Sequence, residues 1–212
     1  MPMATDEMLI DRFAPDWDAS RIEHLIVPGD PGDVYEVLLR ADFLRAWRES
    51  RVVRLLFALR GAGERTVAGV LRKPHLEPDE PEALRLADLP SHGDWVLLAE
   101  DPPDEIAFGV VGRFWGGETI WERIDAAGFS DWSRPGFARI ACNFSLRPYG
   151  QERTLITYEA RTTATDDASR RAFGRYWRLV SPFVGIVMRS MLRVVEGDAR
   201  RARGAAGTGV RS

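Results

Sequence analysis

The pattern of hydrophobic and polar positions is most regular in the second half of the chain. Apolar side chains recur at every second position along residues 138–147 and again along residues 153–163. A period of two is typical of a β-strand that has one buried and one solvent-facing side. Short connections rich in glycine and proline separate such segments, which favours antiparallel neighbours. We predict strands at residues 20–27, 95–100, 105–114, 118–124, 137–147 and 153–163.

The same alternation predicts which side chains face the core. It places Tyr158 on the apolar side of its strand. It places Arg113, Asn143, Glu159 and Arg161 on the solvent-facing side, where cross-strand charge pairs contribute little to stability. If the two faces were exchanged, these acid and guanidinium groups would form a candidate catalytic set. The exposed arrangement is the favoured interpretation.

Residues 166–203 contain the longest segment with helical periodicity. Apolar side chains recur there at steps of three and four between Phe173 and Val195. This spacing predicts one long amphipathic helix. Pro182 lies inside it and predicts a kink, which either opens an entrance for a ligand or follows the curvature of the sheet.

Shorter helices are expected earlier in the chain. Asp30 is a typical N-cap and is followed by a proline, so we predict a helix over residues 33–40. Apolar spacing predicts a second helix over residues 50–61. The proline-rich segment 71–90 is expected to be a surface insertion, or a lid over one end of the sheet, and to include a short helix at residues 82–89.

Composition and charge limit the class of protein. With 212 residues, 45% of them hydrophobic, we expect one domain at residues 18–203, a loose lead-in at residues 1–17 and a disordered tail at residues 204–212. The formal net charge of −3 argues against nucleic acid as a partner. The chain has a single cysteine, no signal-peptide pattern at its N-terminus and no apolar run near the ~20 residues of a membrane span. These features favour a cytoplasmic protein without an integral membrane segment.

The order of these elements resembles a known superfamily. The motifs that carry the resemblance are Val27–Tyr35, Val111–Trp115, Pro135–Phe144, Tyr158–Thr162, Tyr176–Leu179 and Arg189–Leu192. Together they cover roughly residues 18–200, and they are similar to an uncharacterised bacterial branch of the START/Bet v 1-like superfamily, also labelled SRPBCC or polyketide cyclase-like. The resemblance implies an α+β helix-grip fold, in which a curved antiparallel sheet wraps around a long C-terminal helix. It also implies a hydrophobic cavity for lipids, polyketides or similar molecules. It implies no fixed reaction, because one fold hosts many functions.

The first functional hypothesis is a binding module for a hydrophobic small molecule. Its expected lining is aromatic and aliphatic. The candidates are Phe108, Val110, Phe114, Phe144, Tyr158, Tyr176, Trp177 and Met188. The hydroxyl of Tyr158 either contacts the ligand or is bound within the core, and the second role is the commoner one for a buried hydroxyl.

The second hypothesis is an enzyme of the cyclase, aldolase or hydratase kind. Such chemistry needs an acid or base directed into an apolar cavity. The candidates are Tyr158 and Glu159, with Arg161 to polarise a carbonyl. This hypothesis requires at least one carboxylate inside the cavity.

A third hypothesis is peripheral membrane association through the kinked helix, whose apolar centre around Phe183 and Ile186 is flanked by arginines. A homodimer is left open as the assembly. No metal and no cofactor are expected, because the three histidines are scattered and no phosphate-binding glycine motif is present. Cys142 is expected to be a small buried hydrophobe.

Overall fold

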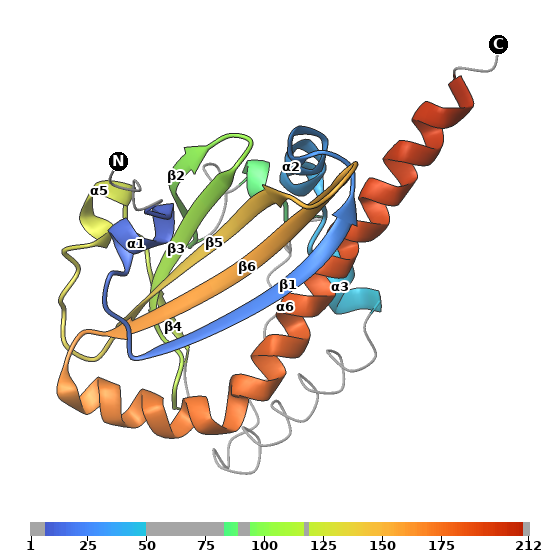
Figure 1. Cartoon of the computed structure of the whole chain (residues 1–212). Coiled ribbons are helices and arrows are strands. Elements are labelled where there is room, and N and C mark those ends of the chain that lie inside the picture. Colours follow the sequence, from blue (N-terminus) through green and yellow to red (C-terminus); the bar gives the residue numbers. More distant parts are fainter. Residues whose placement is uncertain (1–6, 50–82, 89–93, 117–118, 210–212) are drawn as a thin grey trace.

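The computed structural model describes residues 7–49, 83–88, 94–116 and 119–209 (Figure 1). The helix expected at residues 50–61 and most of the insertion at residues 71–90 lie outside the described residues. Within residues 83–88 the structure has one short 3-10 turn, η1 (Leu86–Asp88), in place of the longer helix expected there.

The centre of the fold is a curved sheet in which all pairs of neighbouring strands are antiparallel. Its order is β1-β6-β5-β3-β2, and β4 pairs with β3 beside this path. The strands are β1 (Ala19–Pro28), β2 (Val96–Asp101), β3 (Glu105–Arg113), β4 (Ile120–Glu122), β5 (Ala138–Pro148) and β6 (Arg153–Ala164). They confirm the six predicted strands.

The helices lie on both sides of this sheet. They are α1 (Leu9–Phe13), α2 (Pro31–Arg40), α3 (Leu44–Glu49), α5 (Ala126–Phe129) and α6 (Asp167–Gly209). The predicted cap of α2 is confirmed, because the side chain of Asp30 accepts a hydrogen bond of 3.0 Å from the backbone N–H of Asp33. Helices α3 and α5 were not predicted.

Helix α6 runs across one face of the sheet, where it packs against β1, β6, α2 and α3. Figure 1 shows it changing direction after its first turns, and Pro182 is the proline inside it. A proline lacks the backbone donor and crowds the preceding turn, so the predicted kink has this residue as its cause. The arrangement is the expected α+β helix-grip fold. The helix ends at Gly209, beyond the limit at residue 203 expected from the sequence.

We call the side of the sheet that faces α6 the inner face. It carries Phe108, Phe144 and Tyr158, and Met188 and Leu192 of α6 belong to the same apolar cluster. Strand alternation places the next even-numbered residues of β5 and β6 on this side as well. The inner face is therefore the side on which the expected cavity has to be sought.

We call the opposite side the outer face, and it is covered by α1 and α5. Leu9 and Ile10 of α1 and Phe129 of α5 pack there on Ala107 and Ala141. The loose lead-in expected at residues 1–17 is thus wrong for α1, which is a packed element. The disordered tail expected at residues 204–212 is likewise wrong for residues 204–209, which belong to α6. The rest of the division of the chain stays a prediction.

The small residues of β3 and β5 make this second layer possible. A Cβ added to Gly109 would lie 2.6 Å from Cε2 of Phe129 and 3.0 Å from Cδ1 of Leu98. Because no real side chain tolerates such contacts, Gly109 lets α5 approach the strand closely. Both faces of β3 are consequently buried along almost its whole length.

Candidate functional site

A column of aromatic rings lies on the inner face. The ring of Phe144 is at its centre, with centroid distances of 4.2 Å to Tyr158 and 5.9 Å to Phe108. Phe43, which follows α2, stacks on Phe144 at 6.0 Å, and Trp95 lies 5.6 Å from Phe108. Each such pair contributes roughly 0.5–1.5 kcal/mol beyond its area burial. The column gives the inner face a flat apolar wall.

The hydroxyl of Tyr158 is the polar group in this wall. It donates to Sγ of Cys142 at 3.8 Å, and both residues are buried. Burial raises the pKa of Tyr158 well above its usual value and raises the pKa of the Cys142 thiol to about 12, so both groups are neutral. A thiol is a weak acceptor. The phenol therefore has the capacity to form a stronger hydrogen bond with an oxygen acceptor.

A second aromatic group surrounds the beginning of α6. Phe114 stacks on Trp121 at 5.9 Å and meets Phe173 edge-on at 5.7 Å. Tyr176 lies 6.2 Å from Phe114, and Trp177 lies 5.8 Å from Phe173. This group joins β3 and β4 to the first turns of the helix.

The predicted lining residues therefore fall into two groups on the inner side. Phe108, Phe144, Tyr158 and Met188 belong to the central cluster, whereas Phe114, Tyr176 and Trp177 belong to the second aromatic group. Val110 is buried and lies on the strand segment between the groups. Phe108 and Phe114 are separated by six strand positions, which corresponds to about 20 Å. A ligand that contacted both groups would have to be elongated.

The sequence analysis missed a buried carboxylate on the inner side. Glu23 of β1 is the cross-strand partner of Tyr158, and it is 6% exposed. Arg21 and Arg189 each donate to its carboxylate at 2.5 Å. Burial alone would raise the pKa of Glu23, but the hydrogen bonds from the two arginines outweigh it and hold the pKa below its usual value. Glu23 is thus a fixed anion that joins β1 to α6, rather than a group poised to exchange protons.

The three candidate catalytic residues do not come together. Tyr158 lies on the inner face, whereas Glu159 is directed to the outer face beside α1. Arg161 lies two residues further along β6 and therefore also reaches the outer face. The sheet itself separates the phenol from the acid and the guanidinium.

The prediction that Asn143, Glu159 and Arg161 face solvent is wrong. Their exposed fractions are 0%, 5% and 6%. They do lie on the face opposite Tyr158, as the alternation predicted, but α1 covers that face. Arg113, the fourth residue of this set, is half-buried at the end of β3.

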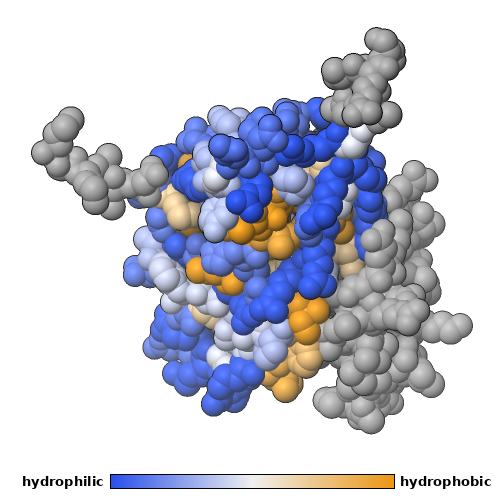
Figure 2. All heavy atoms as spheres, turned by 45° about the vertical axis from the view of Figure 1, so that its right-hand side comes forward, coloured by the Kyte–Doolittle hydropathy of each residue, from blue (hydrophilic) through white to orange (hydrophobic). Residues whose placement is uncertain are grey.

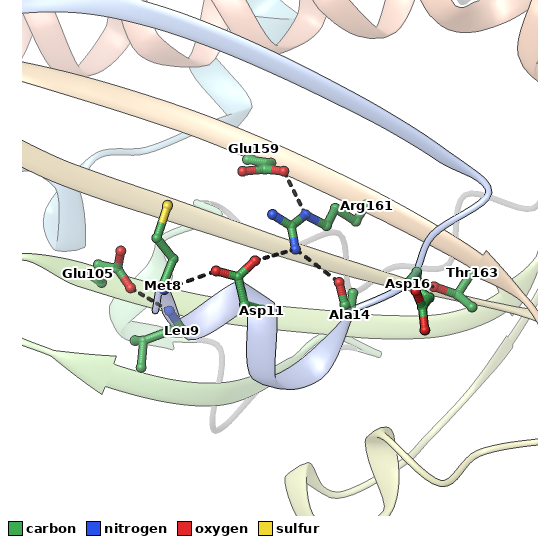
Figure 3. Close-up of polar contacts among 9 residues, drawn as sticks. All are labelled: Met8, Leu9, Asp11, Ala14, Asp16, Glu105, Glu159, Arg161 and Thr163. Atoms are coloured by element: carbon green, nitrogen blue, oxygen red, sulfur yellow. Dashed lines mark hydrogen bonds and ion pairs between the residues drawn. The ribbon is translucent and has the colours of Figure 1, made fainter. Parts of the chain in front are cut away.

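Figure 3 shows how Arg161 links the sheet to α1. Its guanidinium donates to the carboxylate of Glu159 at 2.6 Å, to the carboxylate of Asp11 at 2.7 Å and to the backbone carbonyl of Ala14 at 3.0 Å. Cζ of the same guanidinium lies over the indole of Trp17, 4.1 Å from the ring centroid. Hydrogen bonds to the two carboxylates raise the pKa of Arg161 despite its burial. The arginine therefore keeps its charge and satisfies a buried acid.

Glu105 anchors the other end of α1. Its carboxylate accepts a hydrogen bond of 2.6 Å from the backbone N–H of Leu9, and Arg147 lies 3.5 Å away. Burial raises the pKa of Glu105, and these two contacts only partly offset that effect. α1 is held by polar contacts at both ends.

Asn143 is a buried polar group of this layer whose side chain has no hydrogen-bond partner among the described residues. Within the described part of the chain, neither its amide nitrogen nor its amide oxygen has a hydrogen-bond partner. It is the cross-strand neighbour of Ala107 and Glu159, between the two polar anchors of α1. A buried amide without protein partners usually holds an ordered water.

A sequence signal for the buried outer face exists. Between Glu105 and Arg113, β3 contains only apolar residues and glycine at every position. A strand with one wet side alternates, whereas a strand without polar positions has both sides covered. This pattern indicates that some other segment must cover the outer face.

An open groove of about 530 Å³ lies between α2 and the turn from β2 to β3. It contains none of the eight predicted lining residues. Its walls include four carboxylates and Tyr35, whose hydroxyl donates to Glu100 at 3.2 Å. Its acidic character differs from that of the apolar inner face.

Two further findings concern the described residues. The described residues contain no group of three or more histidine, cysteine, aspartate or glutamate side chains suited to a metal ion. Their helices include none that is both long and apolar enough to cross a membrane.

Comparison with known proteins shows weak likenesses of fold. No protein-family model and no curated protein matches the chain. Solved structures that match include the di-domain ARO/CYC StfQ from the steffimycin biosynthetic pathway, which is 13% identical with a TM-score of 0.41 over 87% of this chain and 51% of that chain. A conserved protein from Geobacillus kaustophilus is 12% identical with a TM-score of 0.40, over 87% of this chain and 97% of that chain. An aromatase/cyclase from a Streptomyces species is 16% identical with a TM-score of 0.31, over 89% and 98%. Scores this low carry no argument about activity, so the function has to be argued from the site.

Proposed function

We propose that this protein is a START/Bet v 1-like domain that binds a hydrophobic small molecule between the inner face of the sheet and α6. The observation that carries the proposal is the hydroxyl of Tyr158, a buried donor whose acceptor is the Cys142 sulfur at 3.8 Å. It lies within a wall of stacked rings. One polar group in an apolar wall is the composition of a site that orients a greasy ligand.

The wall also defines the chemistry of the ligand. Stacked phenylalanine rings favour a flat aromatic or polycyclic body, and the phenol favours a carbonyl or another oxygen acceptor on it. The separation of about 20 Å between Phe108 and Phe114 suits an elongated molecule. A lipid-, polyketide- or aromatic-like compound with one oxygen acceptor has these properties.

The site supports binding better than catalysis. A cyclase, aldolase or hydratase needs an acid or base beside the phenol. Glu159 and Arg161 lie on the outer face and bind each other at 2.6 Å. Glu23 lies on the same side of the sheet as Tyr158, but its ion pairs with two arginines keep it ionised. No observation on the described residues favours the enzyme as a second candidate.

The test is a titration of the protein with a panel of polycyclic phenols, quinones and fatty acids, in which tryptophan fluorescence reports binding. For a ligand that binds, Tyr158→Phe is expected to raise the dissociation constant by about 3- to 10-fold, because it removes one hydrogen bond and keeps the ring. Tyr35→Phe is the matched control. Its ring is also buried, but its hydroxyl points to Glu100 at the acidic groove. Equal effects of the two variants, or binding by neither the wild-type protein nor a variant, would contradict the proposal.

A further inference from the structure

The bend in α6 carries an unusual combination of exposed side chains. Leu179 is 72% exposed and Phe183 is 39% exposed, and Pro182 between them is exposed as well. Figure 2 shows hydrophobic surface interrupting a largely hydrophilic face of the molecule. A single exposed leucine needs no explanation, but three neighbouring exposed apolar side chains form a patch of the kind that marks an interaction site.

Arginines continue the same stripe toward the beginning of the helix. Arg171, Arg175 and Arg178 are exposed, and their spacing of four and three residues places them on the side that leads to Leu179 and Phe183. Within the described residues, none of these three guanidiniums takes part in an ion pair. Arg170, by contrast, is held by Asp18 and Asp167.

The charged side chains of this segment of α6 all have one sign. Between Asp167 and Glu196 the sequence contains no aspartate or glutamate, although the whole chain carries a formal net charge of −3. Positive charge is thus concentrated on a segment of a protein that is acidic overall. Such a segment attracts an anionic surface and has no acidic group of its own to oppose it.

We propose that this surface, formed by Arg171, Arg175, Arg178, Leu179, Pro182 and Phe183, docks on an anionic lipid bilayer. The bend inserts Leu179 and Phe183 at the level of the headgroups, and the three arginines contact lipid phosphates. Apolar residues beside unpaired basic ones are the arrangement by which an interfacial helix binds a membrane. The proposal is independent of the ligand on the inner face, since it uses only side chains that point away from the sheet.

Exposure refines the membrane hypothesis drawn from the sequence. That hypothesis named Phe183 and Ile186, but Ile186 is half-buried. The exposed apolar side chains lie earlier in the helix, at Leu179 and Phe183. The contact therefore lies closer to the arginines than the sequence pattern indicated.

Co-sedimentation of the full-length protein with vesicles tests the proposal. One set of vesicles is made of phosphatidylcholine alone, and the other contains about one quarter phosphatidylglycerol. We expect binding to the anionic vesicles, weak binding to the neutral ones, and a decrease in binding as salt is added, because salt screens exposed charges. Protein that stays in the supernatant with both kinds of vesicle at low salt would overturn the proposal.

Two double variants separate the apolar and the basic contributions. Leu179→Ser with Phe183→Ser is expected to reduce the apparent affinity for anionic vesicles tenfold or more, since two apolar side chains no longer insert. Arg175→Gln with Arg178→Gln is expected to reduce it by roughly tenfold and to remove most of the preference for anionic vesicles. Circular dichroism and urea unfolding check that each variant is folded.

Ile22→Ser with Ile26→Ser is the matched control. These β1 side chains are 44% and 38% exposed, but they lie on the strand rather than on the bend. The control is expected to bind vesicles like the wild type, and an equal loss in both serine variants would overturn the proposal. A second copy of the chain is the competing occupant. If ultracentrifugation shows a dimer that the Leu179 and Phe183 changes abolish, while vesicles bind nothing, the surface is a protein interface instead.

Discussion

Gly185 of α6 lies directly under the guanidinium of Arg21. A Cβ at this position would come within 2.5 Å of Nη2 and 2.7 Å of Cζ of Arg21. The glycine therefore leaves room for the arginine that binds Glu23 on the inner side of the sheet. This contact joins β1, at one edge of the sheet, to α6 just after the bend at Pro182.

Two glycine variants test this contact. Gly174→Ala, also within α6, places its Cβ in open space, so it is expected to stabilise the protein by up to about 1 kcal/mol through helix propensity. Gly185→Ala gains the same propensity but displaces Arg21, so it is expected to be about 1–2 kcal/mol less favourable than Gly174→Ala. Urea unfolding of both variants measures the difference. Equal stabilisation by the two alanines would show that Arg21 moves away at no cost.

A second prediction concerns the pair under α1. Arg161→Met leaves Glu159 buried without its guanidinium, and we expect a loss of about 3–5 kcal/mol in the free energy of unfolding. Arg171→Met is the control, since Arg171 is exposed on α6 and a surface change usually stays within about 0.5 kcal/mol. If Arg161→Met unfolds at the same urea concentration as the control, Arg161 does not support the buried acid.

A third prediction is a pH dependence caused by Glu105. Burial raises its folded-state pKa above the ordinary value near 4.5, so the folded protein holds this proton longer than the unfolded chain does. The stability that it contributes is complete below the unfolded pKa and is lost as the pH rises through the folded pKa. Glu105→Gln keeps an acceptor for the N–H of Leu9 and removes the charge.

Unfolding of both proteins by urea at several pH values from 4 upward measures this effect. We expect the free energy of unfolding of the wild type to fall relative to Glu105→Gln as the pH rises. Glu23, whose pKa is lowered, acts in the opposite direction in both proteins and cancels in the difference. A difference that is constant with pH, or that grows in favour of the wild type, would refute the assignment.

A fourth prediction concerns Cys142. Because burial raises the pKa of its thiol to about 12, the thiolate that reacts with disulfide reagents is nearly absent at pH 8. Native protein is expected to react with a chromogenic disulfide reagent far more slowly than protein in concentrated urea, where the thiol is no longer buried. Equally rapid modification of the native protein would mean that burial does not keep this thiol protonated.

The elements of the fold could be predicted because local patterns determine them. Alternation placed β5 and β6, and apolar runs bounded by glycine and proline turns placed the other four strands. The proline after Asp30 placed the start of α2, and three-to-four spacing placed α6 together with its bend at Pro182. These signals lie within a few residues of one another. α3 and α5 contain six and four residues, too few for a helical period to be visible.

The environment of the polar side chains could not be predicted in the same way. Alternation correctly separated Tyr158 from Glu159, but it does not tell whether the second face is covered. The cover is α1, which is far from β5 and β6 in sequence. Likewise, the pairing of Glu23 with Arg189 joins residues 166 positions apart. Contacts of this kind depend on tertiary packing rather than on a local period.

Native mass spectrometry of the purified protein, followed by denaturing extraction of whatever is bound, tests the central claim most directly. The claim is that the inner face of the sheet holds a hydrophobic small molecule. It predicts a one-to-one adduct, either retained from the cells or formed with a member of the ligand panel, and a weaker adduct for Tyr158→Phe. A bare protein mass in every sample, with no adduct from any class in the panel, would contradict it.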